Sequence, residues 1–92
     1  MYYVYVLQSL KDKYFYVGYT PDLKLRIKKH NKGLVLATKD RRPLRIVYYE
    51  ACLNRDDAIK RERYLKTSWG KRYIKNRLKN YLTGQERQQK HR

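Results

Sequence analysis

Residues 2–19 of the chain, YYVYVLQSLKDKYFYVGY, decide the fold. Aromatic and β-branched residues fill Tyr2–Gln8 and Tyr14–Tyr19, a composition that is typical of strands. In the first run, alternate side chains face opposite ways, with Tyr3, Tyr5 and Leu7 on one face and Tyr2, Val4 and Val6 on the other. The stretch between the runs, Ser9–Lys13, is short, polar and contains an aspartate, so we expect the two strands to form an antiparallel hairpin.

The residues that follow the hairpin have the signals of a helix start. Thr20 can cap the helix, Pro21 suits the first helical position, and Asp22 favours the positive end of the helix. We expect this helix to run to about Asn31, with Gly33 ending it.

The next segments predict a third strand and a second helix. A basic loop over Leu34–Arg42 leads to Pro43, which opens a strand over Leu44–Cys52. Asn54 can cap a helix that ends near Lys66.

The third predicted helix begins with Ser68 as its cap and ends at Gly84, before a polar, basic and unstructured tail over Gln85–Arg92. Four of its apolar residues have helical spacing: Ile74, Leu78, Tyr81 and Leu82. The order β-β-α-β-α-α predicts one α+β domain over residues 1–84, a small three-stranded, mainly antiparallel sheet flanked by three helices.

Charge is the strongest functional signal in this 92-residue chain, which has 24 Lys and Arg against 8 Asp and Glu and a formal net charge of +16. Such an excess favours a polyanionic partner, and we expect nucleic acid, DNA in the first instance. An anionic membrane surface is the rival partner. The basic residues, however, are spread along the whole chain and do not form one amphipathic helix.

The remaining composition excludes several classes of protein. Cys52 is the single cysteine, so no internal disulfide is expected, no Cys/His spacing indicates zinc, and a reduced, cytoplasmic setting fits. Met1–Leu10 lacks the charged region and the cleavage site of a signal peptide. No apolar stretch is long enough to span a bilayer.

Three titratable side chains stand out beside the apolar stripes of the predicted helices. Arg26 and His30 are four residues apart and share a face of the first helix. Glu62 lies within the apolar stripe of the second helix, where a carboxylate is costly unless a metal ion or a cation pairs with it. Each residue also has a purely structural alternative: Glu62 can pair with Lys66, Arg26 can pair with Asp22, and His30 can be a solvated helix-end residue.

The order of these residues resembles the GIY-YIG endonuclease family, in particular its short single-domain members, over about residues 2–80. The matching segments are Tyr3-Val4-Tyr5 and Tyr16-Val17-Gly18 as the two half-motifs, then Tyr19-Thr20-Pro21-Asp22-Leu23, Arg26, His30-Asn31, Tyr48-Tyr49-Glu50, Ala58, Arg61-Glu62 and Leu65-Lys66. The half-motifs depart from the family name at Tyr3, Val4 and Val17. Asn76 does not match the asparagine that follows the glutamate in larger members.

The resemblance implies a metal-dependent endonuclease that hydrolyses DNA phosphodiester bonds, with an active site made of Tyr5, Tyr16, Arg26, His30 and Glu62. One tyrosine would orient or deprotonate the attacking water, Arg26 would contact the scissile phosphate, and His30 would assist proton transfer. Glu62 would hold one divalent cation, Mg²⁺ or in its place Mn²⁺, and Gly18 would leave room for close approach of nucleic acid. Because tyrosine has an ordinary pKa of about 10, we expect Arg26 and the metal to lower the pKa of the acting tyrosine.

A phosphate-binding surface is expected around this site. Its candidates are Lys24, Lys28 and Lys29 on the first helix, Lys39, Arg41 and Arg42 in the loop, and Lys71, Arg72, Lys75, Arg77 and Lys79 on the third helix. Two other functions fit the same charge. One is a basic nucleic-acid-binding module with this fold and little or no cleavage. The other is a domain whose helices bind a larger protein that supplies targeting. Glu62 favours the nuclease, because a pure binding module has no need of a carboxylate near phosphate.

Overall fold

The computed structural model describes the backbone of residues 1–90 and the side chains of residues 1–84. Along the chain the elements are β1 (Tyr2–Ser9), β2 (Phe15–Thr20), α1 (Leu23–Asn31), the 3₁₀ turn η1 (Lys39–Arg41), β3 (Leu44–Cys52), α2 (Arg55–Leu65), α3 (Ser68–Arg77) and α4 (Lys79–Lys90).

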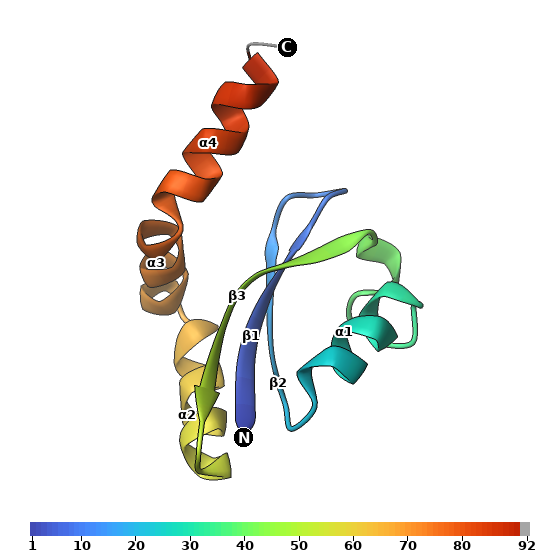
Figure 1. The fold of residues 1–92 in the computed structure, drawn as a ribbon, viewed down its shortest axis with the longest axis vertical. Coiled ribbons are helices and arrows are strands. Elements are labelled where there is room, and N and C mark those ends of the chain that lie inside the picture. The colour runs from blue at the N-terminus through green and yellow to red at the C-terminus, as the bar shows by residue number, and fades with distance from the viewer. Residues whose placement is uncertain (91–92) are drawn as a thin grey trace.

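The strands form one antiparallel sheet with the order β2-β1-β3, so β1 is its central strand (Figure 1). Tyr5 stands opposite Gly18 of β2 on one side and opposite Tyr49 of β3 on the other. The predicted hairpin is therefore confirmed, and β3 has the bounds expected for the third strand. The α+β class is confirmed as well, with four helices in place of three.

The central strand is buried on both of its faces. One face joins α2 and α3 in a core made of Val4, Val6, Val17, Ala58, Leu65 and Ile74. The other face packs against α1 in a cluster made of Tyr5, Leu7 and Leu44, with Leu23 and Ile27 beside them. Figure 1 accordingly shows α1 on one side of the sheet and α2 and α3 on the other. The predicted alternation in β1 is confirmed, and it places Tyr5 on the α1 face.

The first helix is capped by a different residue from the one predicted. Asp22, and not Thr20, is the N-cap, because its carboxylate accepts a hydrogen bond from the backbone N–H of Leu25 at 3.1 Å. Thr20 instead shapes the turn before the helix, where its hydroxyl accepts from the Asp22 N–H and donates to the Asp22 carbonyl. Pro21 consequently lies outside the helix. As expected, Gly33 follows the helix end, with a positive φ of 77° that suits glycine.

The other two caps give one confirmation and one correction. Asn54 caps α2 as predicted, accepting from Asp56 N at 2.8 Å. The cap of α3 is Thr67, one residue before the predicted Ser68, and its hydroxyl accepts from Gly70 N at 3.2 Å. In each case a side-chain oxygen satisfies an N–H group that has no partner within the helix.

The helix predicted from Ser68 to Gly84 is divided in two. Leu78 ends α3 and packs against the core, and α4 begins at Lys79. The backbone of α4 continues through Gly84 to Lys90, so the predicted stop at Gly84 is wrong. The tail predicted over Gln85–Arg92 falls on α4 as far as Lys90, and residues 91–92 lie outside the described residues. In the described part of the chain, every helix is too short or too polar to cross a membrane.

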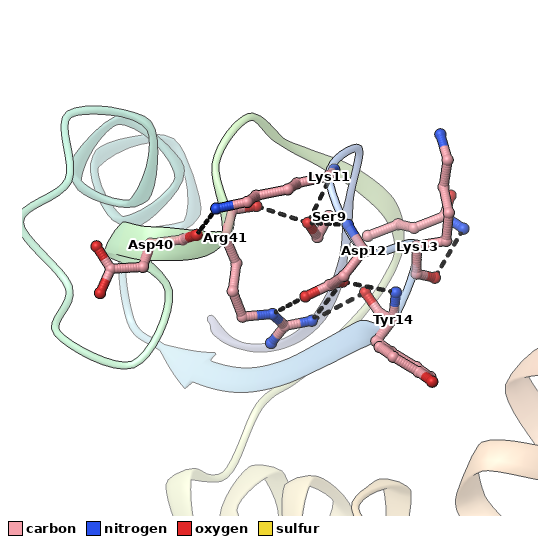
Figure 2. Close-up of polar contacts among 8 residues, drawn as sticks. Ser9, Lys11, Asp12, Lys13, Tyr14, Asp40 and Arg41 are labelled. Atoms are coloured by element: carbon pink, nitrogen blue, oxygen red, sulfur yellow. Dashed lines mark hydrogen bonds and ion pairs between the residues drawn. The ribbon is translucent and has the colours of Figure 1, made fainter.

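The turn of the β1–β2 hairpin is tied to the loop that precedes β3 (Figure 2). The hydroxyl of Ser9 accepts from the backbone N–H groups of Lys11 and Asp12, both at 3.1 Å, and donates to the Arg41 carbonyl at 2.6 Å. Arg41 in turn donates to the Asp12 carboxylate at 2.8 Å and to the Tyr14 carbonyl at 3.1 Å. The hairpin turn and the η1 loop therefore hold each other in place.

Candidate active site

Tyr5 lies at the centre of the α1 face of the sheet and has no exposed surface. Its hydroxyl is 2.8 Å from Nε2 of His30 and accepts a hydrogen bond from Nε of Arg26 at 3.3 Å. Arg26 thus bonds Tyr5, and Asp22, its alternative partner, is occupied in capping α1. A Cβ on Gly18 would lie 2.9 Å from Cε1 of Tyr5 and still closer to Cζ and Oη. The glycine of the second half-motif therefore makes room for the tyrosine of the first.

His30 is fully buried on the inner side of α1, so it is not a solvated helix-end residue. Its Nδ1 lies 2.7 Å from Oγ1 of Thr38 and its Nε2 bonds Tyr5. Burial lowers the pKa of His30 to about 4, and the charge of Arg26 acts in the same direction. The imidazole is therefore neutral at pH 7.

The donors in this chain of contacts determine where the protons lie. Nε of Arg26 can only donate, so the Tyr5 oxygen accepts from it. The Tyr5 hydroxyl is buried and its proton needs an acceptor, which Nε2 of His30 provides at 2.8 Å. A neutral imidazole has one N–H, which then lies on Nδ1 and donates to Thr38. The geometry assigns His30 the Nδ1–H tautomer. The same series of hydrogen bonds holds Arg26 against β1.

Thr38 is the residue of this site that the sequence analysis missed. It is fully buried, and it precedes η1 in the loop that returns from α1 to the sheet. A single threonine in a basic loop has no periodic or spacing signal. Its contact with His30 arises only because the loop folds back over the end of α1.

Burial raises the pKa of Tyr5, and the hydrogen bond and charge of Arg26 oppose that rise without cancelling it. Arg26 thus acts on Tyr5 in the expected direction, but burial outweighs it and the pKa of Tyr5 is raised overall. The reason is that a phenolate in a closed core loses its hydration, and one cation does not replace it. Tyr5 is a neutral hydrogen-bond donor to His30 and a poor base.

Tyr16 is the more accessible of the two half-motif tyrosines. It is half-buried, and its ring centroid lies 5.2 Å from that of His30 and 6.5 Å from that of Tyr5. It also lines a pocket of about 240 Å³ at β2, an edge strand, together with Lys66 and Lys71. Tyr16 therefore packs beside the buried Tyr5–His30 pair and is itself partly exposed.

Glu62 projects from α2 beside Lys66, one helical turn further on. Its Oε2 lies 3.3 Å from Nζ of Lys66, and the Glu62 side chain is 20% exposed. This ion pair is the structural alternative that the sequence allowed. The negative charge of Glu62 also contributes to the raised pKa of Tyr5, so the carboxylate lies within electrostatic range of the buried tyrosine.

The donor set around Glu62 limits the kind of metal that fits. Among the side chains of residues 1–84, no group of three or more His, Cys, Asp or Glu is placed to hold a metal ion. Within this part of the chain, Glu62 therefore has no zinc-type site with four protein ligands. It fits a cation that takes one or two carboxylates and keeps several water molecules, as Mg²⁺ does.

Arg61, next to Glu62, fixes α2 to the sheet. Its Nε and Nη2 each donate to the carboxylate of Glu50 on β3 at 2.9 Å. The hydroxyl of Tyr48 donates to the same carboxylate at 2.8 Å. The guanidinium also lies over the ring of Tyr73, 4.9 Å from its centroid. These contacts join β3, α2 and α3, and so set the position of the helix that carries Glu62.

Most of the predicted phosphate-binding residues are exposed, and Arg41 and Arg42 bond other protein atoms. The exposed lysines are Lys24, Lys28 and Lys29 on α1, Lys39 in η1, Lys71 and Lys75 on α3, and Lys79 at the start of α4. Arg72 and Arg77 are exposed on α3, and the guanidinium of Arg72 lies over Trp69. Arg41 and Arg42 instead bond protein atoms, Arg41 the Asp12 carboxylate at 2.8 Å and Arg42 the Lys39 carbonyl at 2.8 Å.

The chain is similar to known proteins in sequence and in structure. The sequence model of the GIY-YIG catalytic domain family matches residues 1–74. A UPF0213 protein of Clostridium perfringens is 43% identical over 67 residues, which are 72% of this chain and 71% of that protein. A UPF0213 protein of Staphylococcus saprophyticus is 42% identical over 66 residues, which are 71% of this chain and 79% of that protein. The solution NMR structure of a UPF0213 protein from Bacillus halodurans matches with a TM-score of 0.50 and 36% identity, over 80% of this chain and 82% of that one.

Proposed function

Because the chain belongs to the GIY-YIG catalytic domain family, a family of nucleases, we propose that it is a metal-dependent endonuclease that hydrolyses phosphodiester bonds in DNA. The observation that carries the proposal is a convergence of side chains from separate elements: Tyr5 of β1, Tyr16 of β2, Arg26 and His30 of α1, and within electrostatic range Glu62 of α2. The formal net charge of +16 supports a polyanionic substrate.

Arg26 binds the scissile phosphate in this proposal. Its Nε is held by the hydroxyl of Tyr5, and that bond raises the pKa of Arg26, so the guanidinium stays charged. The two Nη atoms provide the fork that matches two phosphate oxygens. Negative charge builds up on these oxygens in the transition state, where a cation that is already fixed in place is most effective.

Tyr16 orients the attacking water, because it is only partly buried and its ring lies beside that of His30, on the same face of the sheet as Tyr5. Tyr5 and His30 are positioning residues. Both are fully buried, and their hydrogen bonds are made within the protein, between Tyr5 and His30 and between His30 and Thr38. Their contribution is to hold Arg26 at a fixed place beside Tyr16.

Glu62 holds the divalent cation, Mg²⁺ or in its place Mn²⁺. The cation, when bound, supplies positive charge that stabilises the charge developing on the phosphate and the leaving oxygen. The carboxylate of Glu62 also pairs with Lys66 at 3.3 Å, so the ammonium group and the cation compete for it.

The same ion pair favours a second candidate function, a basic nucleic-acid-binding module with little or no cleavage. In such a module Lys66 neutralises a carboxylate that would otherwise repel phosphate. The two functions differ in whether a divalent cation can displace Lys66 and lead to cutting.

A cleavage assay separates the two candidates. Purified full-length protein is incubated with labelled duplex, single-stranded and branched DNA, with Mg²⁺, with Mn²⁺ and with a chelator. Metal-dependent cutting that disappears in Glu62→Ala supports the nuclease. Tight, salt-sensitive binding to every DNA without cutting under any metal contradicts it and supports the binding module.

Asp57→Ala is the matched control, since Asp57 is an exposed carboxylate on the same helix and its removal changes the charge by the same amount. We expect this variant to cut like the unmodified protein. Tyr16→Phe and Tyr5→Phe then separate the two tyrosines. The first should reduce the rate at saturating DNA more than the second, and the reverse order would assign the water to Tyr5.

A further inference from the structure

A second basic surface lies beyond the active site, in a groove between the turn of the β1–β2 hairpin and the helices α3 and α4. The groove has a volume of about 980 Å³, and six of its twelve lining residues are basic: Lys13, Arg41, Arg45, Lys71, Lys75 and Lys79. The acidic residue among the twelve is Asp12, which Arg41 neutralises with an ion pair at 2.8 Å. Walls with this excess of one charge attract a polyanion.

The groove adjoins the smaller pocket at β2, to which Tyr16 contributes. Phe15 and Lys71 line both the groove and that pocket, and Lys66 lines the pocket alone. A strand of nucleic acid that leaves the site along the edge of β2 would pass Lys66 and Lys71 before it enters the groove.

The helical wall of the groove carries a row of exposed lysines. Lys71 and Lys75 are one turn apart on α3, about 6 Å along the helix axis. Lys79 continues the row at the start of α4. The match to the family model ends at residue 74, so Lys75 and Lys79 lie beyond it. The family match thus covers Lys71 of this wall and leaves out its other two lysines.

The opposite wall is the hairpin turn, which is held rigid by its bonds to the η1 loop (Figure 2). Lys13 and Tyr14 lie on this wall, and Tyr14 is 74% exposed. Figure 2 shows the ring of Tyr14 pointing away from the polar network, out from the turn. Burial of the ring in the protein thus does not account for its position. An exposed aromatic ring beside a cationic groove is the arrangement on which unpaired bases stack.

We propose that this groove binds the phosphate backbone of a single-stranded segment next to the cleaved position, with a base stacked on Tyr14. The proposal rests on the proposed function, because the groove adjoins the pocket at β2 to which Tyr16 contributes. Among nucleic acids a single strand is favoured over a duplex, because it alone offers free base faces to an aromatic side chain at the groove wall.

Binding measurements test the groove separately from cleavage. Fluorescence anisotropy, with a chelator present to prevent cutting, compares a blunt duplex with the same duplex carrying a single-stranded tail. We expect the tail to tighten binding to the full-length protein, and Lys75→Gln/Lys79→Gln to remove that gain while weakening blunt-duplex binding no more than the loss of two positive charges elsewhere on the surface does. If both lysines contact phosphates of the tail, the slope of log affinity against log salt for the tailed DNA becomes shallower by about 1.4 in this double variant.

Arg55→Gln/Lys60→Gln is the matched control, because both residues are exposed on α2, outside the groove, and the pair removes the same charge. It should leave the gain from the tail intact. Tyr14→Ala should weaken binding of the tailed DNA about tenfold, and that of blunt duplex little. The proposal is overturned if the tail gives no gain, if the groove pair and the control pair reduce the gain equally, or if the groove pair weakens blunt duplex as much as tailed DNA.

The binding result does not depend on the cleavage result. A gain from the tail that requires Lys75 and Lys79 would stand even if no DNA were cut, and only the proposed nuclease activity would then fail. Metal-dependent cutting without a gain from the tail would support the nuclease and refute the groove.

Discussion

The phenol ring of Tyr5 lies over Gly18, its partner on the neighbouring strand, and fills the space that a Cβ on Gly18 would occupy. The half-motif glycine is thus explained by packing within the protein. A side chain at this position would push the Tyr5 hydroxyl away from His30 and Arg26, to which it is bonded at 2.8 and 3.3 Å.

Gly18→Ala should therefore destabilise the protein by about 1–3 kcal/mol, the usual effect of an added methyl group in a closely packed core, and should lower the cleavage rate. Urea denaturation measures the first effect and the DNA assay the second. Gly84→Ala is the control: a Cβ there meets no atom within 4 Å, so that variant should be slightly more stable. Equal stability of Gly18→Ala and the unmodified protein would show that Tyr5 moves aside at no cost.

Thr38→Val should destabilise the protein by about 1–3 kcal/mol, because it leaves Nδ1 of His30 buried without a partner. Thr38→Ser keeps the hydroxyl and should recover most of that loss. The imidazole nitrogen shifts of His30 in NMR spectra give a readout that general loss of packing does not move. We expect the Nδ1–H tautomer in the unmodified protein and in Thr38→Ser, and a mixture in Thr38→Val. An unchanged tautomer in Thr38→Val would exclude a positioning role for Thr38.

Stability should fall as the pH decreases from about 6.5 to about 4. His30 has a pKa of about 4 in the folded protein, below the value of 6.5 for an unperturbed histidine. Between these values the unfolded chain binds a proton that the folded protein does not, so acid favours unfolding. The contribution is present in full above pH 6.5 and amounts to about 3 kcal/mol.

Urea denaturation at a series of pH values measures this slope, and His30→Gln should flatten it. Asp12, whose pKa is held at about 2 by hydrogen bonding to Arg41, titrates below this range. A slope that persists unchanged in His30→Gln would assign it to other groups.

Lys66→Gln should tighten the binding of Mn²⁺ several-fold, because it removes the ammonium group that lies 3.3 Å from the Glu62 carboxylate. Electron paramagnetic resonance of free Mn²⁺ measures the affinity in the absence of DNA. Lys60→Gln removes the same charge from an exposed position on the same helix and is the control. Equal affinities for the two variants would mean that Lys66 does not compete for the metal ligand.

Much of the fold follows from local sequence patterns. The alternation in β1, the short polar turn after it and the cap at Asn54 involve residues close together in the chain, and all three are present in the structure. The errors also have local causes. Thr20 and Asp22 can both cap a helix, and the structure uses Asp22 because Thr20 bonds the turn backbone instead. Gly84 is a weak stop, since a helix tolerates a glycine around which nothing packs.

The candidate site was only partly readable from the sequence. The spacing of Arg26 and His30 placed them on one face of α1, and the structure brings both to Tyr5. The ambiguity at Glu62 could not be resolved from spacing, because an i, i+4 lysine fits a metal ligand and a surface ion pair equally. Thr38, which contacts Nδ1 of His30, lies in a loop that has no periodic sequence pattern.

By itself the sequence determined the order of the strands and of the first two helices, the alternation of side chains between the two faces of β1, and the basic character that favours a polyanionic partner. Only the tertiary structure decided that Tyr5 is the buried half-motif tyrosine and that His30 is neutral. It also decided that Lys71, Lys75 and Lys79 line one groove with the hairpin turn. The physical reason is how far apart along the chain the residues lie that set each property. Strand alternation and helix capping depend on neighbours a few residues apart, whereas hydration, protonation and the shape of a surface depend on segments that meet only after folding.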